Sequence, residues 1–249
     1  MTANKILEIH DVKREFVMGD QIVRALKGIS FDVNAGEFLT IMGSSGSGKT
    51  TLLNMLGCLD KPTDGIYMLD NVNVKELSRD ELARLRNTKI GFVFQAYNLL
   101  PRTTALENVE LPLMYNPTIG TQERKDRAIA ALEAVKLGDR FDHTPNQLSG
   151  GQQQRVAIAR ALVNEPVMIL ADEATGNLDT RTSYEIMSLM QDLNANGKTI
   201  VFVTHEPDIA AFSSRTVMLK DGRIVKDTQN TNRRSASEAL AGLPVSDDY

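Results

Sequence analysis

Short apolar runs alternate along the chain with segments of helical periodicity. Four of these runs, at 38–42, 90–94, 167–171 and 199–203, have the length of buried strands. A strand that is apolar at nearly every position is buried on both faces, which is typical of parallel strands covered by helices. The pattern therefore predicts an α/β fold whose central sheet is mostly parallel.

Between the runs, apolar side chains recur every three or four positions. This spacing predicts helices at about 50–59, 122–137, 153–163 and 182–195. Three capping boxes, in which Ser or Thr precedes Glu by three positions, predict helix starts at Ser78–Glu81, Thr104–Glu107 and Thr182–Glu185.

The patterns also divide the chain. Residues 6–35 have the pattern of short strands around a turn, which predicts an N-terminal antiparallel β subdomain. Residues 97–164 show helical patterns and no convincing strand, which predicts an inserted helical subdomain. Late in the chain, Asp221-Gly222 between two strand-like runs predicts a hairpin. We expect one domain over 1–226 and a loose polar tail over 227–249.

Composition and charge narrow the class of protein. The chain has 249 residues, 42% of them hydrophobic, and its 28 basic and 32 acidic residues give a net charge of −4. A nucleic-acid binder usually has a basic excess, so this balance gives that class no support. The chain has a single cysteine, Cys58, no apolar run close to the ~20 residues that span a bilayer, and no leader or lipidation motif. We expect a soluble cytoplasmic chain that reaches a membrane only through a partner.

A glycine-rich loop, Gly43-Ser44-Ser45-Gly46-Ser47-Gly48-Lys49-Thr50, follows the first apolar run. It satisfies the pattern G-x-x-x-x-G-K-[ST] between a predicted strand and a predicted helix. The glycines allow backbone N–H groups to converge on phosphate oxygens, Lys49 adds a point charge, and the Thr50 hydroxyl is a ligand for Mg²⁺. This context favours a phosphate site, with Thr51 as a further contact, over a flexible Gly/Ser linker.

Two acids, Asp172 and Glu173, end the run at 167–171. A strand buried on both faces cannot hold free carboxylates, so both acids belong at its exposed carboxyl end, where open α/β sheets bind ligands. Asp172 is expected to hold Mg²⁺, directly or through water, and Glu173 to orient and deprotonate an attacking water. The alternative is that two acids merely end a strand and cap a helix, and a phosphate loop nearby weakens it.

A second glycine motif, Leu148-Ser149-Gly150-Gly151-Gln152, precedes the helix at 153–163. It offers another helix N-terminus suited to an anion. The chain has one phosphate loop, so a second anion site is redundant within one molecule. Taken alone, the motif is better explained as a connection between elements.

The order and spacing of these three motifs resemble the nucleotide-binding subunits of ABC transporters over roughly residues 6–226. The resemblance implies a P-loop NTPase core that binds and hydrolyses ATP with Mg²⁺. It also implies further site residues, each of which would have an ordinary structural explanation alone: Gln95 (catalytic Q-loop glutamine and metal ligand), His205 (catalytic switch histidine at the γ-phosphate), Asp179 (in the D-loop Asn177-Leu178-Asp179) and Phe16 (stacking on adenine).

The resemblance also gives the second glycine motif a use. In this family two subunits meet head to tail, so Ser149 and Gly151 of one would close over the ATP held by Lys49 of the other, with Gly150 and Gln152 beside them. ATP then holds a homodimer together and hydrolysis separates it. A membrane permease on a separate chain is the implied partner, and it places this chain peripherally at the inner face of the cell membrane.

Longer segments resemble the branch of the family that serves macrolide export and lipoprotein release: 57–63, 90–95, 107–112 and 152–160. Export, release or transmission of force across the membrane is the implied task, with 96–115 as the surface that docks the permease. Two positions depart from the branch pattern. Ala174 replaces a proline, as in exporter-type relatives, and Phe16 replaces a commoner tyrosine but keeps an aromatic face.

Other classes fit the residues less well. ABC ATPases that act on nucleic acid or ribosomes often have two ATPase units in one chain or a long coiled coil, and this chain has one unit and no heptad run. A regulator that binds ATP without hydrolysing it would lack Glu173, His205 or the second glycine motif. A soluble P-loop kinase has no need of that motif. We therefore expect an ATPase that drives a transporter and binds no nucleic acid.

Overall fold

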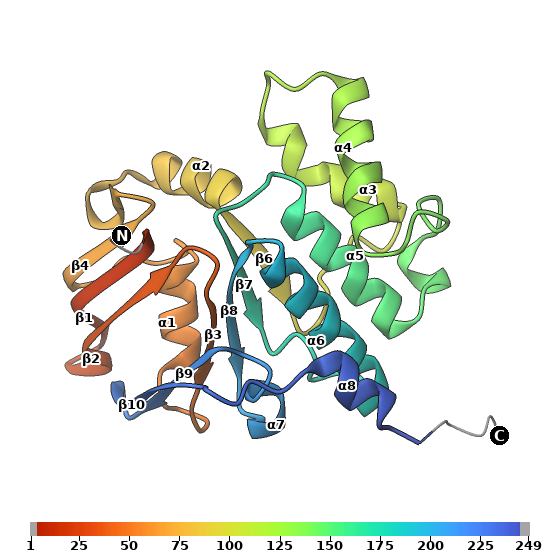
Figure 1. Ribbon diagram of the computed structural model, residues 1–249. Coiled ribbons are helices and arrows are strands. Elements are labelled where there is room, and N and C mark those ends of the chain that lie inside the picture. The colour runs from red at the N-terminus through yellow and green to blue at the C-terminus, as the bar shows by residue number, and fades with distance from the viewer. Residues whose placement is uncertain (1–3, 245–249) are drawn as a thin grey trace.

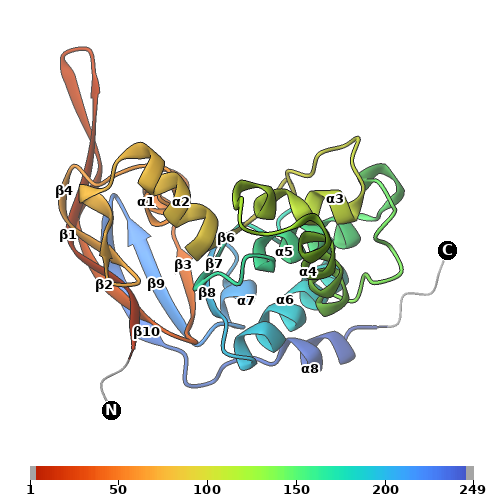
Figure 2. The same cartoon turned by 90° about the horizontal axis from the view of Figure 1, so that it is seen from above.

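The computed structural model describes residues 4–244, which form two sheets and a group of helices (Figure 1). The N-terminal sheet is antiparallel, as predicted, in the order β2-β1-β4-β5. Its strands are β1 (Lys5–Met18), β2 (Gln21–Asn34), β4 (Asp64–Leu69) and β5 (Val72–Asn73). Residues 6–35 are not several short strands, because β1 and β2 each continue for 14 residues through shifts in their register. Such bulges bend a strand without ending it, and the β1–β2 hairpin projects from the body (Figure 2).

The second sheet has six strands in the order β10-β9-β3-β8-β7-β6. Its strands are β3 (Phe38–Met42), β6 (Ile90–Phe94), β7 (Met168–Asp172), β8 (Thr199–Thr204), β9 (Arg215–Lys220) and β10 (Arg223–Gln229). All four predicted runs are strands, and every pairing except β9–β10 is parallel. Asp221 and Gly222 have φ of 50° and 76°, as the turn of a two-residue hairpin requires.

Each central strand is buried on both faces and contributes to two apolar clusters. Leu170 of β7 and Val201 of β8 face the cluster shared with α1 (Lys49–Leu56) and the antiparallel sheet. Their neighbours Ile169 and Ile200 face the cluster shared with the helices on the other side. Because successive side chains of a strand point to opposite faces, this division requires apolar residues at consecutive positions. The continuous apolar runs in the sequence therefore result from burial on both faces.

Residues 97–164 contain helices and no strand. They form α3 (Ala105–Glu110), α4 (Thr121–Ala134) and α5 (Gly150–Leu162), with short 3-10 turns at Leu111–Tyr115 and Pro145–Gln147. These helices gather on one side of the six-stranded sheet, away from the antiparallel sheet (Figures 1 and 2). Elsewhere lie a 3-10 turn at Val74–Glu76, α2 (Arg79–Lys89), α6 (Thr180–Ala195), α7 (Pro207–Ala210) and α8 (Ala236–Ala241). No helix within 4–244 has the length and apolar character that crossing a membrane requires.

Two of the three predicted capping boxes, Ser78–Glu81 and Thr104–Glu107, open α2 and α3. The third, Thr182–Glu185, is wrong, because the N-cap of α6 is Asp179, three residues before Thr182. The Asp179 carboxylate accepts hydrogen bonds from the Thr182 backbone N–H (2.9 Å) and hydroxyl (2.6 Å). Aspartate is among the strongest N-cap residues, so it fixes the start of the helix ahead of threonine.

The prediction of a loose tail is wrong for residues 227–244. Strand β10 continues to Gln229, and α8 packs against α6. Gln191 of α6 donates to the carbonyl of Arg234 (2.8 Å) and accepts from the N–H of Ala236 (2.8 Å), which is fully buried. A polar composition does not reveal such a partner more than 40 positions away. The rest of the predicted tail, 245–249, lies outside the described residues, and the domain boundary near 226 stays a prediction.

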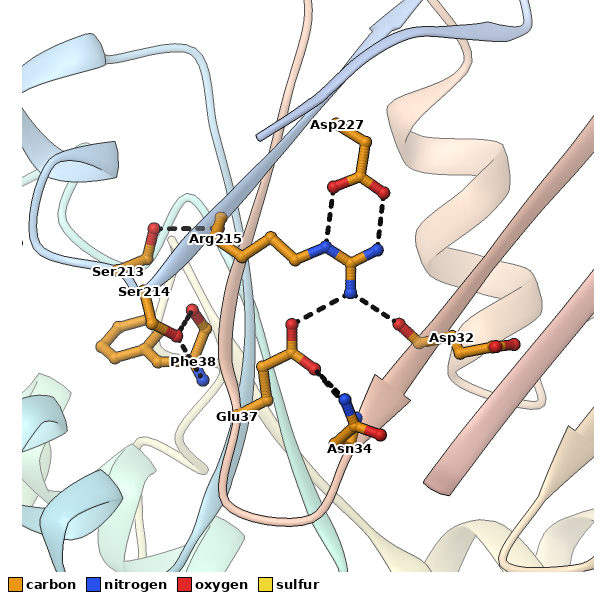
Figure 3. A network of polar contacts seen from close by, with 8 residues as sticks. All are labelled: Asp32, Asn34, Glu37, Phe38, Ser213, Ser214, Arg215 and Asp227. Atoms are coloured by element: carbon orange, nitrogen blue, oxygen red, sulfur yellow. Dashed lines mark hydrogen bonds and ion pairs between the residues drawn. The ribbon is translucent and has the colours of Figure 1, made fainter. Parts of the chain in front are cut away.

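Arg215 of β9 joins the two sheets (Figure 3). Its guanidinium donates to both carboxylate oxygens of Asp227 on β10 (2.7 and 2.6 Å) and to Glu37 (3.0 Å). It also donates to the backbone carbonyl of Asp32 on β2 (2.9 Å). The hydrogen bonds to Asp227 and then Glu37 raise the pKa of Arg215 against the effect of its burial. The side chain is only 12% exposed, so it forms a buried ionic link between the sheets.

Candidate active site

A cavity of about 1150 Å³ lies at the carboxyl ends of the parallel strands. Its walls come from the loops after β3, β6, β7 and β8, from strand β2 and from the β9–β10 turn. The predicted site residues that line it are Ser44, Ser45, Gly46, Gly48, Lys49, Thr50, Thr51, Gln95, Asp172, Glu173 and His205. The fold thus collects in one place residues that are up to 161 positions apart in the sequence, from Ser44 to His205.

The phosphate loop is fixed by close backbone packing. Gly48 has a φ of 103°, and a Cβ atom there would lie 2.8 Å from the carbonyl oxygen of Ala25. The loop is also tied to the hairpin turn, because the N–H of Gly222 donates to the carbonyl of Ser47 (2.9 Å). The Lys49 ammonium folds over the loop and donates to the carbonyls of Gly43 (2.7 Å) and Ser44 (3.0 Å). The carbonyls of Gly43 and Ser47 thus anchor the loop, and neither residue lines the cavity.

The two acids after β7 have different surroundings. Burial and then the charge of Glu173 raise the pKa of Asp172, while the nearby Lys49 ammonium lowers it. Glu173 has a φ of 45°, a conformation that non-glycine residues rarely adopt. Its N–H donates to the carbonyl of Val203 on β8 (2.9 Å), and its Oε1 lies 3.0 Å from Nδ1 of His205. Strained backbone of this kind clusters at functional sites, and here it aims one carboxylate at the histidine.

Gln95 is held by Asn177, a residue of the predicted D-loop whose contact with Gln95 the sequence did not reveal. Its side-chain NH₂ donates to Oδ1 of Asn177 (3.0 Å), and the Asn177 NH₂ donates back to the carbonyl of Gln95 (3.1 Å). A Cβ atom at Gly176 would lie 2.7 Å from the Gln95 amide nitrogen, so the glycine leaves room for this pair. Because the bond uses the NH₂, the amide oxygen of Gln95 stays available as a ligand.

The predicted magnesium ligands fit that ion. Thr50, Gln95 and Asp172 all line the cavity and offer a hydroxyl, an amide oxygen and a carboxylate. Oxygen donors of this kind are the ligands that Mg²⁺ prefers beside phosphate groups. The donor set is therefore suited to the ion.

The second glycine motif lies apart from the cavity. Ser149 caps α5 by accepting a hydrogen bond from the N–H of Gln152 (3.3 Å), and Oε1 of Gln152 accepts one from the N–H of Ser149 (2.9 Å). A Cβ atom at Gly151 would lie 2.5 Å from a methyl carbon of Thr182, so that glycine allows close packing on α6. Asp179 is also outside the cavity, and its hydrogen bonds from Thr182 lower its pKa. None of residues 149–152 lines the phosphate cavity of its own chain.

Phe16 stands beside the cavity and does not line it. It is half-buried on β1 opposite Val23, a lining residue of β2, and the Arg14 guanidinium lies 4.5 Å from its ring centre. Residues directly opposite in an antiparallel pair share a face, so the ring borders the cavity mouth. Its role at adenine stays a prediction.

Sequence reasoning missed several lining residues: Val23, Arg24, Ala25, Lys27, Asp221 and Gly222. They belong to β2 and to the turn between β9 and β10. The hairpin signal at Asp221-Gly222 was visible in the sequence, but its closeness to the phosphate loop depends on the sheet order. Nothing local in the sequence marks these positions as part of the site.

The match to a known protein family covers the segment that holds these motifs. The family model described as ABC transporter matches residues 26–176. This chain belongs to the ABC transporter family. An ABC transporter ATP-binding protein of Bacillus subtilis strain 168, YvrO, is 52% identical over 222 residues, 89% of this chain and 96% of the relative.

Two further relatives refine the comparison. The macrolide export ATP-binding/permease protein MacB of Brucella melitensis is 50% identical over 92% of this ABC chain and 35% of its own length. The ATP-binding cassette MJ0796, solved as a dimer in a post-hydrolysis state with ADP and Pi, has a TM-score of 0.81 at 49% identity. That alignment covers 90% of this chain and 98% of the cassette. The predicted family and fold class are confirmed, and the chain is an ABC-type ATP-binding subunit.

Proposed function

We propose that this chain hydrolyses ATP in a head-to-tail homodimer and thereby drives a membrane permease that is a separate chain. The observation that carries the proposal is the single cavity in which the phosphate loop meets Asp172, Glu173 and His205. Family membership and the ADP- and Pi-bound cassette at 49% identity support ATP as the substrate. Similarity to MacB, a macrolide export protein, supports export as the task. Lipoprotein release stays an alternative that rests on the branch resemblance of the sequence segments alone.

The residues of the cavity have distinct tasks in this reaction. Backbone N–H groups of the phosphate loop and the Lys49 ammonium bind the β and γ phosphates. Glu173 accepts the proton of the attacking water, whose oxygen bonds to the γ-phosphorus while the bond to the bridging oxygen of ADP breaks. His205, 3.0 Å from the Glu173 carboxylate, orients that base and contacts the γ-phosphate.

Thr50, Gln95 and Asp172 are the residues that would hold Mg²⁺ beside the phosphates. When bound, the ion supplies charge neutralisation of the phosphate oxygens. Gln95 connects this site to Asn177 and so to the segment that leads to Asp179. The position of the Gln95 side chain therefore depends on the loop after β6, which carries it, and on the loop after β7, which carries Asn177.

The homodimer gives the second glycine motif its place. Residues 149–152 do not line the cavity of their own chain, and Ser149 is exposed at the start of α5. Two copies of MJ0796 form a dimer in the solved cassette. In the proposed dimer the motif of one copy closes over the γ-phosphate bound by the other, so ATP stabilises the closed state and ADP does not.

The permease docks on segment 96–115. Large apolar side chains are exposed there, with Leu100 45%, Met114 61% and Tyr115 74% exposed. Exposed apolar groups of this size mark interaction surfaces. MacB carries its ATP-binding and permease parts in one protein, and this chain covers 35% of it. Docking to a separate permease would hold this chain at the cytoplasmic face of the membrane.

The test is the Glu173→Gln variant, examined by size-exclusion chromatography with light scattering and by ATPase assay. The amide keeps the shape of the side chain but cannot take a proton, so ATP binding should persist while hydrolysis stalls. We expect a monomer without nucleotide and a dimer with Mg-ATP. Normal turnover in the variant would exclude Glu173 as the base. A monomer that demonstrably binds ATP would exclude dimerisation by the isolated subunit.

A further inference from the structure

The loop that follows Gln95 has an unusual backbone. Tyr97 and Asn98 have φ of 58° and 51°, so two successive non-glycine residues occupy the left-handed region. Side chains disfavour that region, and single residues rather than pairs are the rule there. An isolated segment of this sequence would leave the conformation, so contacts from elsewhere must maintain it.

Arg160 on α5 supplies those contacts. One guanidinium nitrogen donates to the carbonyl of Asn98 (2.6 Å) and the other to the carbonyl of Tyr97 (2.7 Å). The planar guanidinium presents its donors in a fixed fork, which suits two adjacent carbonyl groups. Within the described residues the side-chain hydrogen bonds of Arg160 go to these two carbonyls, and burial lowers the pKa of its guanidinium. The two carbonyls are thus the polar partners of the partly buried Arg160 guanidinium.

Helix α5 packs closely against β6 and against the loop that follows it. Gly91 of β6 packs directly on the carbonyl of Ala161, the residue after Arg160. At the other end of the helix, a Cβ atom on Gly150 would lie 2.9 Å from the Tyr97 hydroxyl. Tyr97 thus approaches α5 at two points, with its carbonyl at Arg160 and with its hydroxyl at Gly150 of the second glycine motif. Its position is therefore set by the helix that carries that motif.

We propose that Arg160 is a positioning residue that holds the 97–98 segment in its left-handed conformation and thereby fixes Gln95 relative to α5. The inference rests on the proposed function, since Gln95 matters only if the cavity hydrolyses ATP. Through this contact the catalytic glutamine and the second glycine motif move as one body. A shift of α5 alters the Gln95 side chain without any change in the phosphate loop.

The test compares steady-state ATPase kinetics of the wild type with those of Arg160→Ala and Arg160→Lys. We expect kcat to fall by about 10- to 100-fold in Arg160→Ala, as small misplacement of a catalytic group does. KM for ATP should change by less than about threefold, because the phosphate loop is untouched. Lysine has three donors on one nitrogen but lacks the fixed planar fork that matches these two carbonyls, so Arg160→Lys should remain impaired. Replacing Asn98 by glycine, which adopts positive φ freely, should recover part of the kcat of Arg160→Ala.

Arg155→Ala is the matched control on the same helix. Arg155 donates to the carbonyl of Val135 (3.3 Å) and to Glu185 (3.3 Å), away from the Gln95 loop. It should lower the thermal midpoint to a similar extent and keep kcat within about threefold of wild type. Wild-type kcat in Arg160→Ala would overturn the proposal. Equal losses of kcat in Arg160→Ala and Arg155→Ala would also overturn it, by showing a general effect of helix stability. The proposed function is tested separately, by ATP hydrolysis of the wild-type protein and by the ATP-dependent dimer of Glu173→Gln.

Discussion

Glu173 combines a left-handed backbone with a carboxylate that points at a histidine. Its φ is 45°, and its Oε1 lies 3.0 Å from Nδ1 of His205. The conformation is maintained by the N–H of Glu173, which donates to the carbonyl of Val203 (2.9 Å). The alanine that follows, Ala174, is almost fully buried, so packing also fixes the turn. The neighbouring strand therefore fixes the direction of this carboxylate.

At this scale we predict the effect of Lys49→Ala. Lys49 is the cation of the phosphate loop, and its ammonium lies within the cavity. Loss of one preorganised charged contact to the transferred phosphate should reduce kcat/KM for ATP by about 100-fold or more. The exposed Lys125 of α4 provides the control, since Lys125→Ala removes an equal charge far from the cavity. ATPase activity that is equal in both variants would exclude the assigned role of Lys49.

At the scale of elements, the hydrogen bonds of single side chains fix how neighbouring segments join. Asp179 fixes the start of α6, and Arg215 joins β9, β10 and β2. Both contacts influence loops around the cavity. The segment before Asp179 contains Asn177, which binds Gln95. The β9–β10 turn contains Gly222, which donates a hydrogen bond to the phosphate loop. These side chains are therefore expected to influence stability more than their exposure to solvent would suggest.

The N-cap predicts a dependence of stability on pH. Replacing Asp179 by alanine should lower the free energy of unfolding by about 1 kcal/mol at pH 7. The hydrogen bonds from Thr182 lower the pKa of Asp179 in the folded state. Its contribution is therefore present above the unfolded pKa of about 3.9 and is lost as pH falls through the lower folded value. Urea unfolding should show the gap between wild type and Asp179→Ala closing below pH 4.

Asparagine is the matched control at this position. It caps a helix about as well as aspartate and carries no titratable proton, so Asp179→Asn should keep the stability of the wild type at pH 7. Its unfolding free energy should also lack the part of the acid dependence that Asp179 contributes. A pH dependence identical in wild type and Asp179→Asn would contradict the assignment of the lowered pKa.

The link between the sheets gives a second stability prediction. Arg215→Ala leaves Glu37, whose side chain is 10% exposed, without its cationic partner. Removing one member of a buried ion pair costs about 3–5 kcal/mol. The exposed pair of Arg127 and Glu123 on α4 is the control, because such pairs contribute only about 0.3–0.5 kcal/mol. A urea midpoint that shifts equally in Arg215→Ala and Arg127→Ala would show that Arg215 does not join the sheets in solution.

At the scale of the whole molecule, one chain contains the parts of a site but does not close it. The phosphate loop, Asp172 and His205 share a cavity, whereas the second glycine motif at 149–152 lies outside it. Two copies arranged head to tail would supply what each lacks. The same arrangement makes assembly depend on nucleotide, so binding and hydrolysis become a cycle of association and separation.

We predict that Ser149→Arg, placed in the Glu173→Gln background, separates binding from assembly. ATP affinity of the monomer should stay within about threefold, because Ser149 does not line its own cavity. The ATP-dependent dimer should be lost, because a bulky cation replaces the small residue that we propose faces the partner's nucleotide. The control is Ser237→Arg, the same change at an exposed position near the start of α8. Weakened ATP binding by the monomer would indicate that the motif acts within its own chain.

The sequence alone determined the family, the parallel sheet and the residues of the phosphate loop and acid pair. These features depend on neighbours in the chain: apolar runs that record burial on two faces, and motifs whose residues act as a contiguous unit. Only the tertiary structure decided the position of Asn177 against Gln95, the hold of Arg160 on the 97–98 segment and the packing of 227–244. Each of these contacts joins residues more than 40 positions apart. Their partners are chosen by sheet order and helix packing, which no local pattern of side chains encodes.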